Sequence, residues 1–594
     1  MEKKQGWKRL QKLSFDKKRL SQRALKAEVV TRKHANKFVV KRLRSLRDAR
    51  QHIASWLFIV GAIIGLVALQ MTLYQTGYKT LAATSGGTYG EAINGSIDTL
   101  NPLFATTNAE QSASYLIFSR LFDYDSTGHL RNDIARDVRL DETQKIYTIT
   151  LRDDVKWHDG AKLTADDVVY TVDTMKNPEV RAVMRNNWHE VAVKKVNTHV
   201  VQFTLPAPYA TFRHALTFSI LPKHILAQVQ PSALRENTFS VSPVGSGPFK
   251  IRLLQTIPGR DSQKIAHLNA WTDYYQGAPK LARFELHAYD KPESLVQALK
   301  VGDVNAAAGI PLKSDLPKQF VVNDIPLGSG VYAIFNTTSP QLTDVTIRQA
   351  IQKATDTRLL RKNIGVPELP LDLPFIPHQI EATALPQKPT IKMQEANALL
   401  EAAGWKLSGK VRTKDGKPLE LKIAAIKDER YKVVIDELVR QWKQLGITTK
   451  VDLFDTTTNQ QSFAQAVLQP RMYDVLVNEL VIGGDADVYA YWHSSQAQAL
   501  GYNFANYQNG ISDDTLSSAR VRNDPTLRAR KYTAFAQQWI SDAPAIGLFQ
   551  SSMRYAHTKA AQGTSTKETL PTAVDRYTDI LYWTAERGHV YKTP

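Results

Sequence analysis

The stretch that decides the fold is residues 147–175, with the sequence YTITLRDDVKWHDGAKLTADDVVYTVDTM. Its first residues alternate between apolar and polar side chains, a pattern typical of a strand with one buried face, and we expect the strand to continue to Trp157. The triplet His-Asp-Gly at 158–160 predicts a tight turn, because glycine accepts a positive φ angle. Thr164, followed three residues later by Asp167, matches the capping box that begins a helix. A strand, a turn and an amphipathic helix in this order predict a mixed α/β protein.

Helical patterns recur further along the chain. Apolar residues stand at helical spacing in Gln111–Phe122, Ala396–Ala403 and Tyr431–Leu445. Gly404 and Gly446 follow the last two segments, and a glycine in this place is typical of a helix end. The roughly 510 residues that follow the N-terminal segment are too many for one ordinary core, so we expect two or three lobes.

An apolar run near the N-terminus predicts a membrane-spanning helix. Residues 53–74, IASWLFIVGAIIGLVALQMTLY, carry no charge, and a helix of this length spans roughly 30 Å of hydrocarbon. The buried helix of a soluble core is the alternative, but such a helix usually keeps a polar face. The basic region before the run is too long for a signal peptide, so we expect an uncleaved anchor; cleavage before Ser85 is the alternative.

The charges on the two sides of this run predict its direction. Residues 1–52 contain 18 Lys and Arg against 4 Asp and Glu, which gives +14 of the chain's net charge of +19. Basic residues favour the cytoplasmic side, so we expect the N-terminus inside the cell and the α/β part outside it, extracellular or periplasmic. The chain has no cysteine, which excludes disulfides, thiolate metal sites and a lipid-modified cysteine as the anchor.

The basic tail predicts contact with the membrane and not with nucleic acid. The pI near 9.6 arises mainly from charges that would lie beside anionic lipid. Apolar residues are interleaved with Arg and Lys between Leu20 and Ile53, a composition that suits a helix lying on the inner membrane surface. A solvated basic helix without a particular partner is the alternative.

The sequence carries no strong enzyme signature. The motifs G-x-S-x-G, H-E-x-x-H and G-x-x-x-x-G-K-[ST] are all absent, and the tight turn already explains the pair His158–Asp159. Asp485-Ala486-Asp487 is a D-x-D motif, which in a membrane-anchored protein also fits a metal-dependent glycosyltransferase. We predict no catalytic residue, no cofactor and no metal site.

Several segments together resemble one protein family. The segment WHDGAKLTADDVVYTV is similar to the signature of the family 5 solute-binding proteins, which are the oligopeptide- and dipeptide-binding components of ABC importers. Further family-like segments follow in the expected order over roughly residues 85–555: ILPKHIL (220–226), GSGPFK (245–250), Tyr332–Asn336, DVTIRQAIQKA (344–354), ANALLEAAGW (396–405), QWKQLG (441–446), Tyr473-Asp474, Gly483–Asp487, YWHSS (491–495) and Asn503.

The resemblance implies an α/β fold of the type II periplasmic-binding-protein class. It has two main lobes and a subdomain, which here follow a basic cytoplasmic tail and one transmembrane helix. The boundaries that we expect are 1–52 for the tail, 53–74 for the helix, 75–85 for a spacer, 86–122, 241–330 and 546–594 for lobe I, 123–240 for its subdomain, and 331–545 for lobe II.

The resemblance also implies a ligand site between the lobes. An acidic residue of the glycine-rich block binds the peptide amine in this family, and Asp485 matches it better than Asp487; that either carboxylate caps the next helix is the alternative. The other residues that we expect around the ligand are Tyr332, Asn336, Tyr491, Trp492 and Asn503 of lobe II and Phe104, Thr106 and Thr107 of lobe I. Core packing is the alternative for each aromatic residue. The glycines that we expect to act as hinges are Gly245, Gly247 and Gly330.

The expected function is therefore capture and delivery without chemistry. We expect a monomeric, membrane-anchored solute-binding protein that holds a short oligopeptide or another small solute between its lobes and passes it to ABC permease subunits. A ligand sensor that signals through the anchor and a D-x-D glycosyltransferase are the alternatives. The ligand itself does not follow from the sequence.

Overall fold

The computed structural model of the chain describes residues 17–40, 50–257, 260–365, 369–380, 385–455, 462–563 and 568–591. These residues form two compact units, which are Met1–Ala82 with Gly588–Pro594, and Ala83–Arg587. All the residues predicted to bind ligand lie in the second unit.

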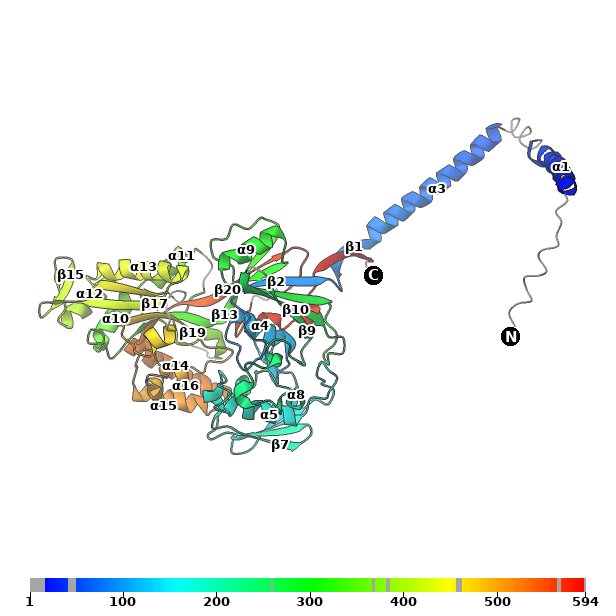
Figure 1. Ribbon diagram of the computed structural model, residues 1–594. Helices are drawn as coiled ribbons and strands as arrows, with labels where there is room; N and C mark the ends of the chain where they lie inside the picture. Colours follow the sequence, from blue (N-terminus) through cyan, green and yellow to red (C-terminus); the bar gives the residue numbers. More distant parts are fainter. Residues whose placement is uncertain are drawn as a thin grey trace. The chain divides into compact units, whose positions relative to one another are not determined.

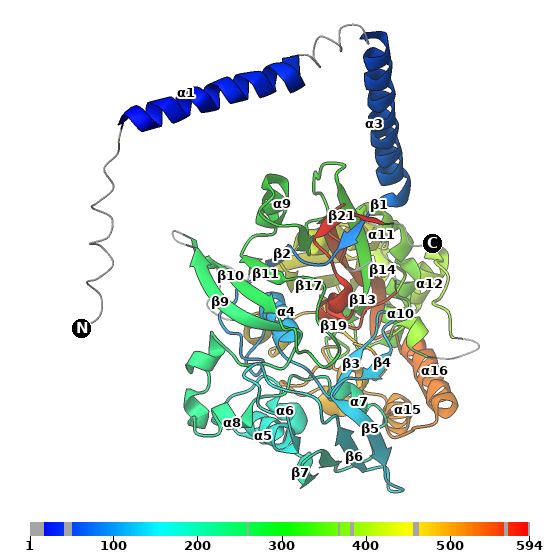
Figure 2. The same ribbon diagram turned by 90° about the vertical axis from the view of Figure 1, so that its right-hand side faces the viewer.

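Two helices make up most of the first unit (Figure 2), namely α1 (Lys17–His34) and α3 (Arg50–Tyr78), and Ala35–Val40 continues α1 as a π-helical turn. Within α3, the segment His52–Tyr74 has a mean hydropathy of 2.2 and no buried part. In the described part of the chain it is the one helix long and apolar enough to cross a membrane. The predicted apolar helix is thus confirmed as a helix, whereas residues 41–49 of the predicted membrane-surface helix lie outside the described residues.

A ten-stranded sheet is the framework of the second unit (Figure 1), with the strand order β18-β17-β19-β13-β20-β12-β2-β11-β10-β9. Its strands are β2 (Thr88–Asn94), β9 (Phe249–Ile257), β10 (Arg260–Ala270), β11 (Arg283–Tyr289), β12 (Ala306–Ala308), β13 (Phe320–Phe335), β17 (Glu420–Ile426), β18 (Thr448–Phe454), β19 (Val475–Val481) and β20 (Ala545–Thr558). We call the part with β2 and β9–β12 lobe I, and the part with β17–β19 lobe II. A separate two-stranded sheet pairs β1 (Lys79–Thr84) with β21 (Glu586–Tyr591).

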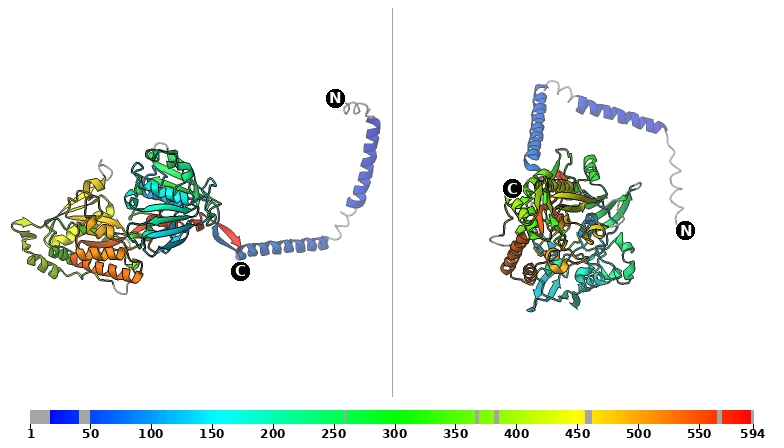
Figure 3. Two further views of the ribbon diagram at one scale, coloured as in Figure 1. Left: turned by 90° about the horizontal axis from the view of Figure 1, so that it is seen from below. Right: turned by 90° about the vertical axis from the view of Figure 1, so that its left-hand side faces the viewer.

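Two long strands, β13 and β20, join the lobes (Figure 3). They pair with each other antiparallel over most of their length, and their register shifts between Pro326 and Gly330. On one side of this shift β20 pairs with β12 of lobe I, and on the other side β13 pairs with β19 of lobe II. The chain therefore crosses between the lobes inside continuous strands. The lobe boundaries expected at residues 330 and 545 stay predictions.

Two of the three expected hinge glycines do not lie at this crossing. Gly245 and Gly247 pack inside lobe I against the carbonyl of Ile117, where a Cβ atom on Gly245 would lie 2.0 Å from the carbonyl oxygen. The N–H of Gly247 donates a hydrogen bond to the same oxygen over 2.8 Å. Close packing already accounts for both glycines, and their role as hinges stays a prediction. Gly330 does lie at the crossing, and its role as a hinge stays a prediction.

The subdomain is a four-stranded sheet with the order β5-β6-β8-β7. Its strands are β5 (Ala135–Leu140), β6 (Ile146–Leu151), β7 (Ala192–Asn197) and β8 (Val200–Thr204). The helix α5 (Ala165–Lys176) begins with the predicted capping box, in which the N–H of Thr164 donates to the Asp167 carboxylate over 2.8 Å. The strand does not continue to Trp157 as predicted: β6 ends at Leu151, and Trp157 is buried in the core of lobe I.

Helices cover both faces of the large sheet (Figure 1). The longer ones are α4 (Asn108–Ile117), α9 (Pro292–Val301), α10 (Val345–Ala354), α11 (Thr357–Ile364), α12 (Met393–Ala402), α13 (Glu429–Gln444), α15 (Gly510–Arg520) and α16 (Pro525–Asp542). The shorter ones are α6 (Arg185–Trp188), α7 (Phe212–Ala215), α8 (Lys223–Leu226) and α14 (Tyr489–Trp492). The two helices predicted to end before Gly404 and Gly446 are confirmed as α12 and α13.

The helix predicted over Gln111–Phe122 ends earlier than expected. Phe118 is already extended, and the backbone N–H and hydroxyl of Ser119 both bond to Ser246 instead of to the helix. Phe122 begins the short strand β3 (Phe122–Tyr124), which pairs with β4 (Leu130–Asn132). Bonds to a segment distant in the sequence therefore end α4, and the apolar pattern alone does not reveal them.

Parallel strands occur in both lobes. In lobe I β2 runs parallel to β11 and β12, and in lobe II β17 runs parallel to β18 and β19. Open α/β sheets bind ligands beyond the carboxyl ends of their parallel strands. The region beyond Asn94, Ala308, Ile426 and Val481 is therefore where a ligand site is expected.

Candidate functional site

A cavity of about 360 Å³ lies beyond these strand ends. Lobe I contributes Asn94 and residues 308–312, and lobe II contributes residues 428–430 and Glu479. Residues 551–554 of β20, one of the two joining strands, also line it. Its volume falls within the range of about 300–1,000 Å³ that is usual for small-ligand sites. The cavity lies between two lobes that are joined by strands, which is the arrangement that lobe movement can open and close.

Two arginines that line the cavity already have carboxylate partners. The guanidinium of Arg554 donates to the Leu312 carbonyl over 2.5 Å and lies 3.6 Å from Asp324. Arg576 is fully buried and forms an ion pair of 2.6 Å with Glu91. Burial alone would lower the pKa of Arg576, but the nearby carboxylate raises it above its ordinary value. These groups are therefore not free to exchange their partners for a ligand, because a buried ion pair that loses one partner is strongly destabilising.

Asp485, the residue predicted to bind a peptide amine, is engaged by Arg528 of α16. One guanidinium nitrogen donates to Oδ2 over 2.6 Å and the other contacts Oδ1. The two side chains are only 16% and 15% exposed. Burial alone would lower the pKa of Arg528, but the bonds and charge of Asp485 raise it. The carboxylate is thus neutralised inside the protein, and Asp485 does not line the cavity.

Asp487 has an arginine partner as well. Its Oδ2 atom lies 3.2 Å from Nε of Arg520, at the end of α15. Its Oδ1 atom accepts a bond of 3.3 Å from the N–H of Tyr489, the first residue of α14. The N-cap of α14 is Val488, and no side chain caps this helix, so the Asp487 bond is a local turn contact and not a helix cap. With an arginine beside each carboxylate, the D-x-D motif presents no excess negative charge for a metal ion.

Four predicted contact residues of lobe II lie in its interior. Tyr332 and Trp492 are packed edge to face, with ring centroids 6.1 Å apart, and the Tyr332 hydroxyl donates to the Leu373 carbonyl. The Asn336 amide donates to two backbone carbonyls and the Asn503 amide does the same. These four residues hold the loops of lobe II in place, and none of them lines the cavity.

The remaining predicted contact residues also make internal bonds. The Tyr491 hydroxyl donates to the Val481 carbonyl over 2.5 Å at the end of β19. Phe104 is buried in the core of lobe I. Thr107 is the N-cap of α4, and the N–H groups of Thr106 and Thr107 donate to the carboxylate of Glu110. In this state the loop after Asn101-Pro102 is organised by its own helix, and the predicted contacts with a ligand stay predictions.

The lobes also touch at a second place, between lobe II and the subdomain. Arg520 lies between two tyrosine rings, that of Tyr209 in the subdomain and that of Tyr489 in lobe II, each 4.6 Å from the guanidinium carbon. The Arg520 carbonyl accepts a bond of 2.9 Å from the N–H of Ala210. Burial raises the pKa of Tyr209 to about 12, with a further rise from the charge of Asp487. Lobe II is therefore held at this contact as well as at the joining strands.

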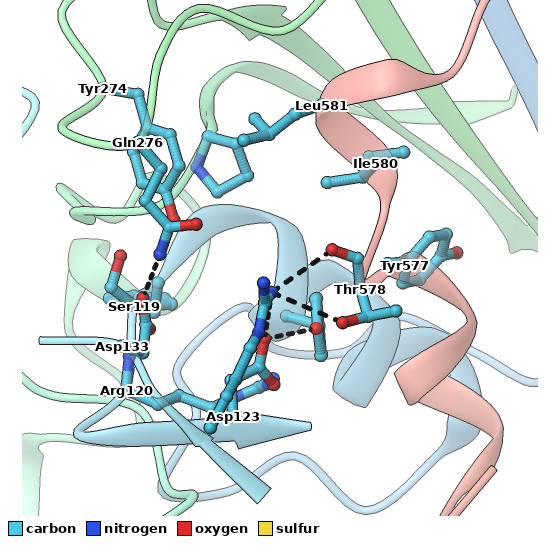
Figure 4. Close-up of a pocket in the computed structure, with 14 residues that line it drawn as sticks. Ser119, Arg120, Asp123, Asp133, Tyr274, Gln276, Tyr577, Thr578, Ile580 and Leu581 are labelled. Atoms are coloured by element: carbon cyan, nitrogen blue, oxygen red, sulfur yellow. Dashed lines mark hydrogen bonds and ion pairs between the residues drawn. The ribbon is translucent and has the colours of Figure 1, made fainter. Parts of the chain in front are cut away.

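A second, much smaller pocket lies within lobe I (Figure 4). Its volume of about 30 Å³ is enough for one water molecule or two. Asp123 accepts from Arg120 over 3.3 Å, and Asp133 bonds to Gln276 over 2.5 Å. Burial and the charge of Asp123 raise the pKa of Asp133 to about 6. This pocket is too small for a peptide, and its groups connect the C-terminal segment at Tyr577 and Thr578 to the rest of lobe I.

Comparison with known sequences identifies the family of this two-lobed protein. Residues 129–501 match the family described as bacterial extracellular solute-binding proteins, family 5 Middle. The chain belongs to this family. The predicted membership in the solute-binding proteins of ABC importers is thus confirmed. A curated relative is the oligopeptide-binding protein AppA of Bacillus subtilis, strain 168, which is 26% identical over 497 residues, 80% of this chain and 88% of AppA.

Solved structures confirm the fold of this family 5 protein. Bacillus subtilis AppA in complex with a nonapeptide superimposes with a TM-score of 0.68 at 22% identity, over 85% of this chain and 99% of the other. NikZ from Campylobacter jejuni in complex with Ni(L-His) gives a TM-score of 0.69 at 25% identity, over 84% and 99%. The predicted type II periplasmic-binding-protein-like fold with two main lobes is therefore correct.

Four charged residues are not among the predicted site residues: Arg430 and Glu479, which line the cavity, and Arg520 and Arg528, which hold Asp487 and Asp485. Arg430 follows the Asp428 cap of α13, and its position after a strand is a signal that could have been used. Arg528 lies 43 residues after Asp485, and no local pattern connects two residues at that separation. Glu479 is the one charged residue of β19, a strand that is apolar apart from Glu479 and Asn478, and a charge there is a recognisable exception.

Proposed function

We propose that this protein is a membrane-anchored solute-binding protein that captures short peptides between its lobes and delivers them to an ABC permease. The observation that carries this proposal is the cavity of about 360 Å³ beyond the strand ends, lined by both lobes and by a joining strand. The relatives support the class of ligand, because AppA is named for binding oligopeptides and a solved AppA structure holds a nonapeptide. The protein would release its ligand unaltered.

The anchor in this proposal is the apolar segment of α3. His52–Tyr74 is long enough to span a bilayer, and the +14 charge of residues 1–52 favours a cytoplasmic N-terminus. The basic helix α1 ends with Arg32, Lys33 and His34 and would lie near anionic lipid headgroups. Anchoring would keep the binding lobes close to the permease, which raises their effective concentration there.

Lobe movement about β13 and β20 would admit and release the ligand. The register shift between Pro326 and Gly330 interrupts the pairing of these strands between the lobes. The contact of Arg520 with Tyr209 would close the opposite end. We keep Tyr491, Thr106 and Thr107 as residues that would meet a ligand after such movement; Asp485 would meet one only if it gave up its bonds to Arg528.

Isothermal titration tests this proposal directly. The full chain, purified in detergent, is titrated with pools of peptides of two to nine residues. We expect saturable heat for at least one length class, and recovery of the peptide intact by mass spectrometry. Absence of heat and of thermal stabilisation with every pool would contradict peptide capture, and recovery of cleaved peptide would contradict release without chemistry.

A further inference from the structure

Two oppositely charged side chains of the cavity lack an ionic partner. Among the residues that the structure describes, neither Arg430 nor Glu479 forms an ion pair, although both line the same cavity. Arg430 is half-buried in the first turn of α13, and no hydrogen bond of its guanidinium occurs within the described residues. Glu479 is half-buried on β19 and accepts one bond, of 2.5 Å, from the hydroxyl of Ser329.

The other charged groups that line the cavity are less suited to pair with a charged group of a ligand. Asp428 is used as the cap of α13, where it accepts from the N–H groups of Arg430 and Tyr431. Glu293 and Glu429 are exposed to solvent, which screens their charges. Arg554 and Arg576 are paired with carboxylates. One half-buried cation and one half-buried anion are therefore left for a ligand.

Glu479 and Arg430 are held on the same side of lobe II. The charge of Glu479 contributes, after burial, to a raised pKa of Tyr431, the residue that follows Arg430 in α13. It also contributes to the raised pKa of Tyr491. Glu479 and Arg430 therefore lie in the same part of lobe II, and both line the cavity.

Asp485 is poorly suited to bind an ammonium group. Its carboxylate already holds both terminal nitrogens of Arg528, and an ammonium that displaced Arg528 would leave a guanidinium buried without a partner. The loss of one member of a buried pair is strongly unfavourable. Glu479 carries no such internal counterion, so an ammonium can approach it without breaking an existing ion pair.

We propose that Glu479 binds the ammonium group and Arg430 the carboxylate of a small zwitterionic peptide. Both contacts are charge-assisted hydrogen bonds, the strongest class available to a peptide's ends. A cavity of about 360 Å³ is near the lower end of the usual range for ligand sites, which favours peptides of two or three residues. The assignment rests on the proposed function and narrows it to short peptides with both ends free.

The test compares peptides with free and blocked ends. Native mass spectrometry and titration calorimetry measure binding of a pool of di- and tripeptides to the full chain in detergent, beside the same pool with acetylated N-termini or amidated C-termini. We expect each block to weaken binding by about 10- to 100-fold, the range for hydrogen bonds to charged groups. Glu479→Gln should remove the preference for a free amine, and Arg430→Gln the preference for a free carboxylate.

Two control variants separate this site from the alternatives. Glu429→Gln changes an exposed carboxylate of the same cavity and should keep both preferences. Asp485→Asn should also keep them; if Asp485→Asn removes the preference for a free amine and Glu479→Gln does not, the assignment is overturned. Wild-type protein that binds only peptides longer than three residues overturns it as well, while leaving peptide capture intact. Wild-type protein that binds no peptide of any length contradicts the proposed function itself.

Discussion

At the scale of single residues, Gly484 decides how closely the lobes approach. A Cβ atom at this position would lie 2.5 Å from Cε1 of Tyr124, and the Tyr124 hydroxyl is hydrogen-bonded to Nδ1 of His214 over 2.9 Å. The ring therefore has a fixed place in the interface, and only a residue without a side chain fits against it. Burial lowers the pKa of His214, which keeps the ring neutral beside Tyr124.

Replacement of Gly484 by valine should hold the lobes apart. We expect Gly484→Val to increase the radius of gyration measured by small-angle scattering and to weaken peptide binding by about tenfold, because overpacking costs typically 1–3 kcal/mol. Gly510→Ala is the matched control, since no atom lies within 4 Å of a Cβ atom there. Unchanged scattering and binding for Gly484→Val would show that this interface is not part of the closed state.

At the scale of elements, the C-terminal segment contains one buried carboxyl group, Asp575, and is attached to lobe I by the bond of Arg131 to Thr578 and the ion pair of Arg576 with Glu91. Asp575 accepts from the N–H and hydroxyl of Thr572, and Thr578 accepts from Arg131, which also contacts Asp123. Burial, with the charge of Asp123 as the next cause, raises the pKa of Asp575 to about 6. The pKa of Asp133 is also raised to about 6, by burial and by the charge of Asp123. The fold therefore favours the protonated form of both carboxyl groups.

These raised pKa values predict that both carboxyl groups contribute to the stability of the protein in mild acid. The contribution is fully present below the ordinary pKa of 3.8 and is lost as the pH rises through about 6. Buried histidines act in the opposite direction, because burial lowers the pKa of His158 to about 4 and also lowers the pKa of His214, so the carboxyl groups are assessed by comparing variants. As the pH falls from 7.5 to 4.5, the slope of the free energy of unfolding in urea against pH should shift toward lower stability in acid for Asp133→Asn and Asp575→Asn relative to the wild type, whereas Asp137→Asn, at a carboxylate that is 51% exposed, should not change it. A slope that is unchanged in both buried variants would contradict this account.

Other elements show which features a sequence can predict. The capping box of α5 and the ends of α12 and α13 are encoded within a few residues, so local patterns predict them correctly. The end of α4 depends on Ser246, and the pairing of Asp485 depends on Arg528. Both partners are far away in the sequence. The family signature predicts the fold. Which charged groups remain available in the cavity cannot be predicted from it, because that depends on which side chains are paired with each other in the folded protein.

At the scale of the whole binding unit, two lobes on a pair of joining strands should move as a clamp. The chain contains no cysteine, so two introduced cysteines carry the only thiol-reactive labels. Val301 in lobe I and Val451 in lobe II are 57% and 45% exposed, and their replacement by cysteine should leave the fold unchanged.

Single-molecule energy transfer between labels at these two positions tests the central claim most directly. The labelled full chain is observed in detergent with and without a saturating peptide pool. The account predicts a broad or two-state distribution of transfer efficiency without peptide and a single closed-state peak with it, reversed when peptide is removed. A distribution that does not change with any peptide pool would contradict a clamp that closes on its ligand.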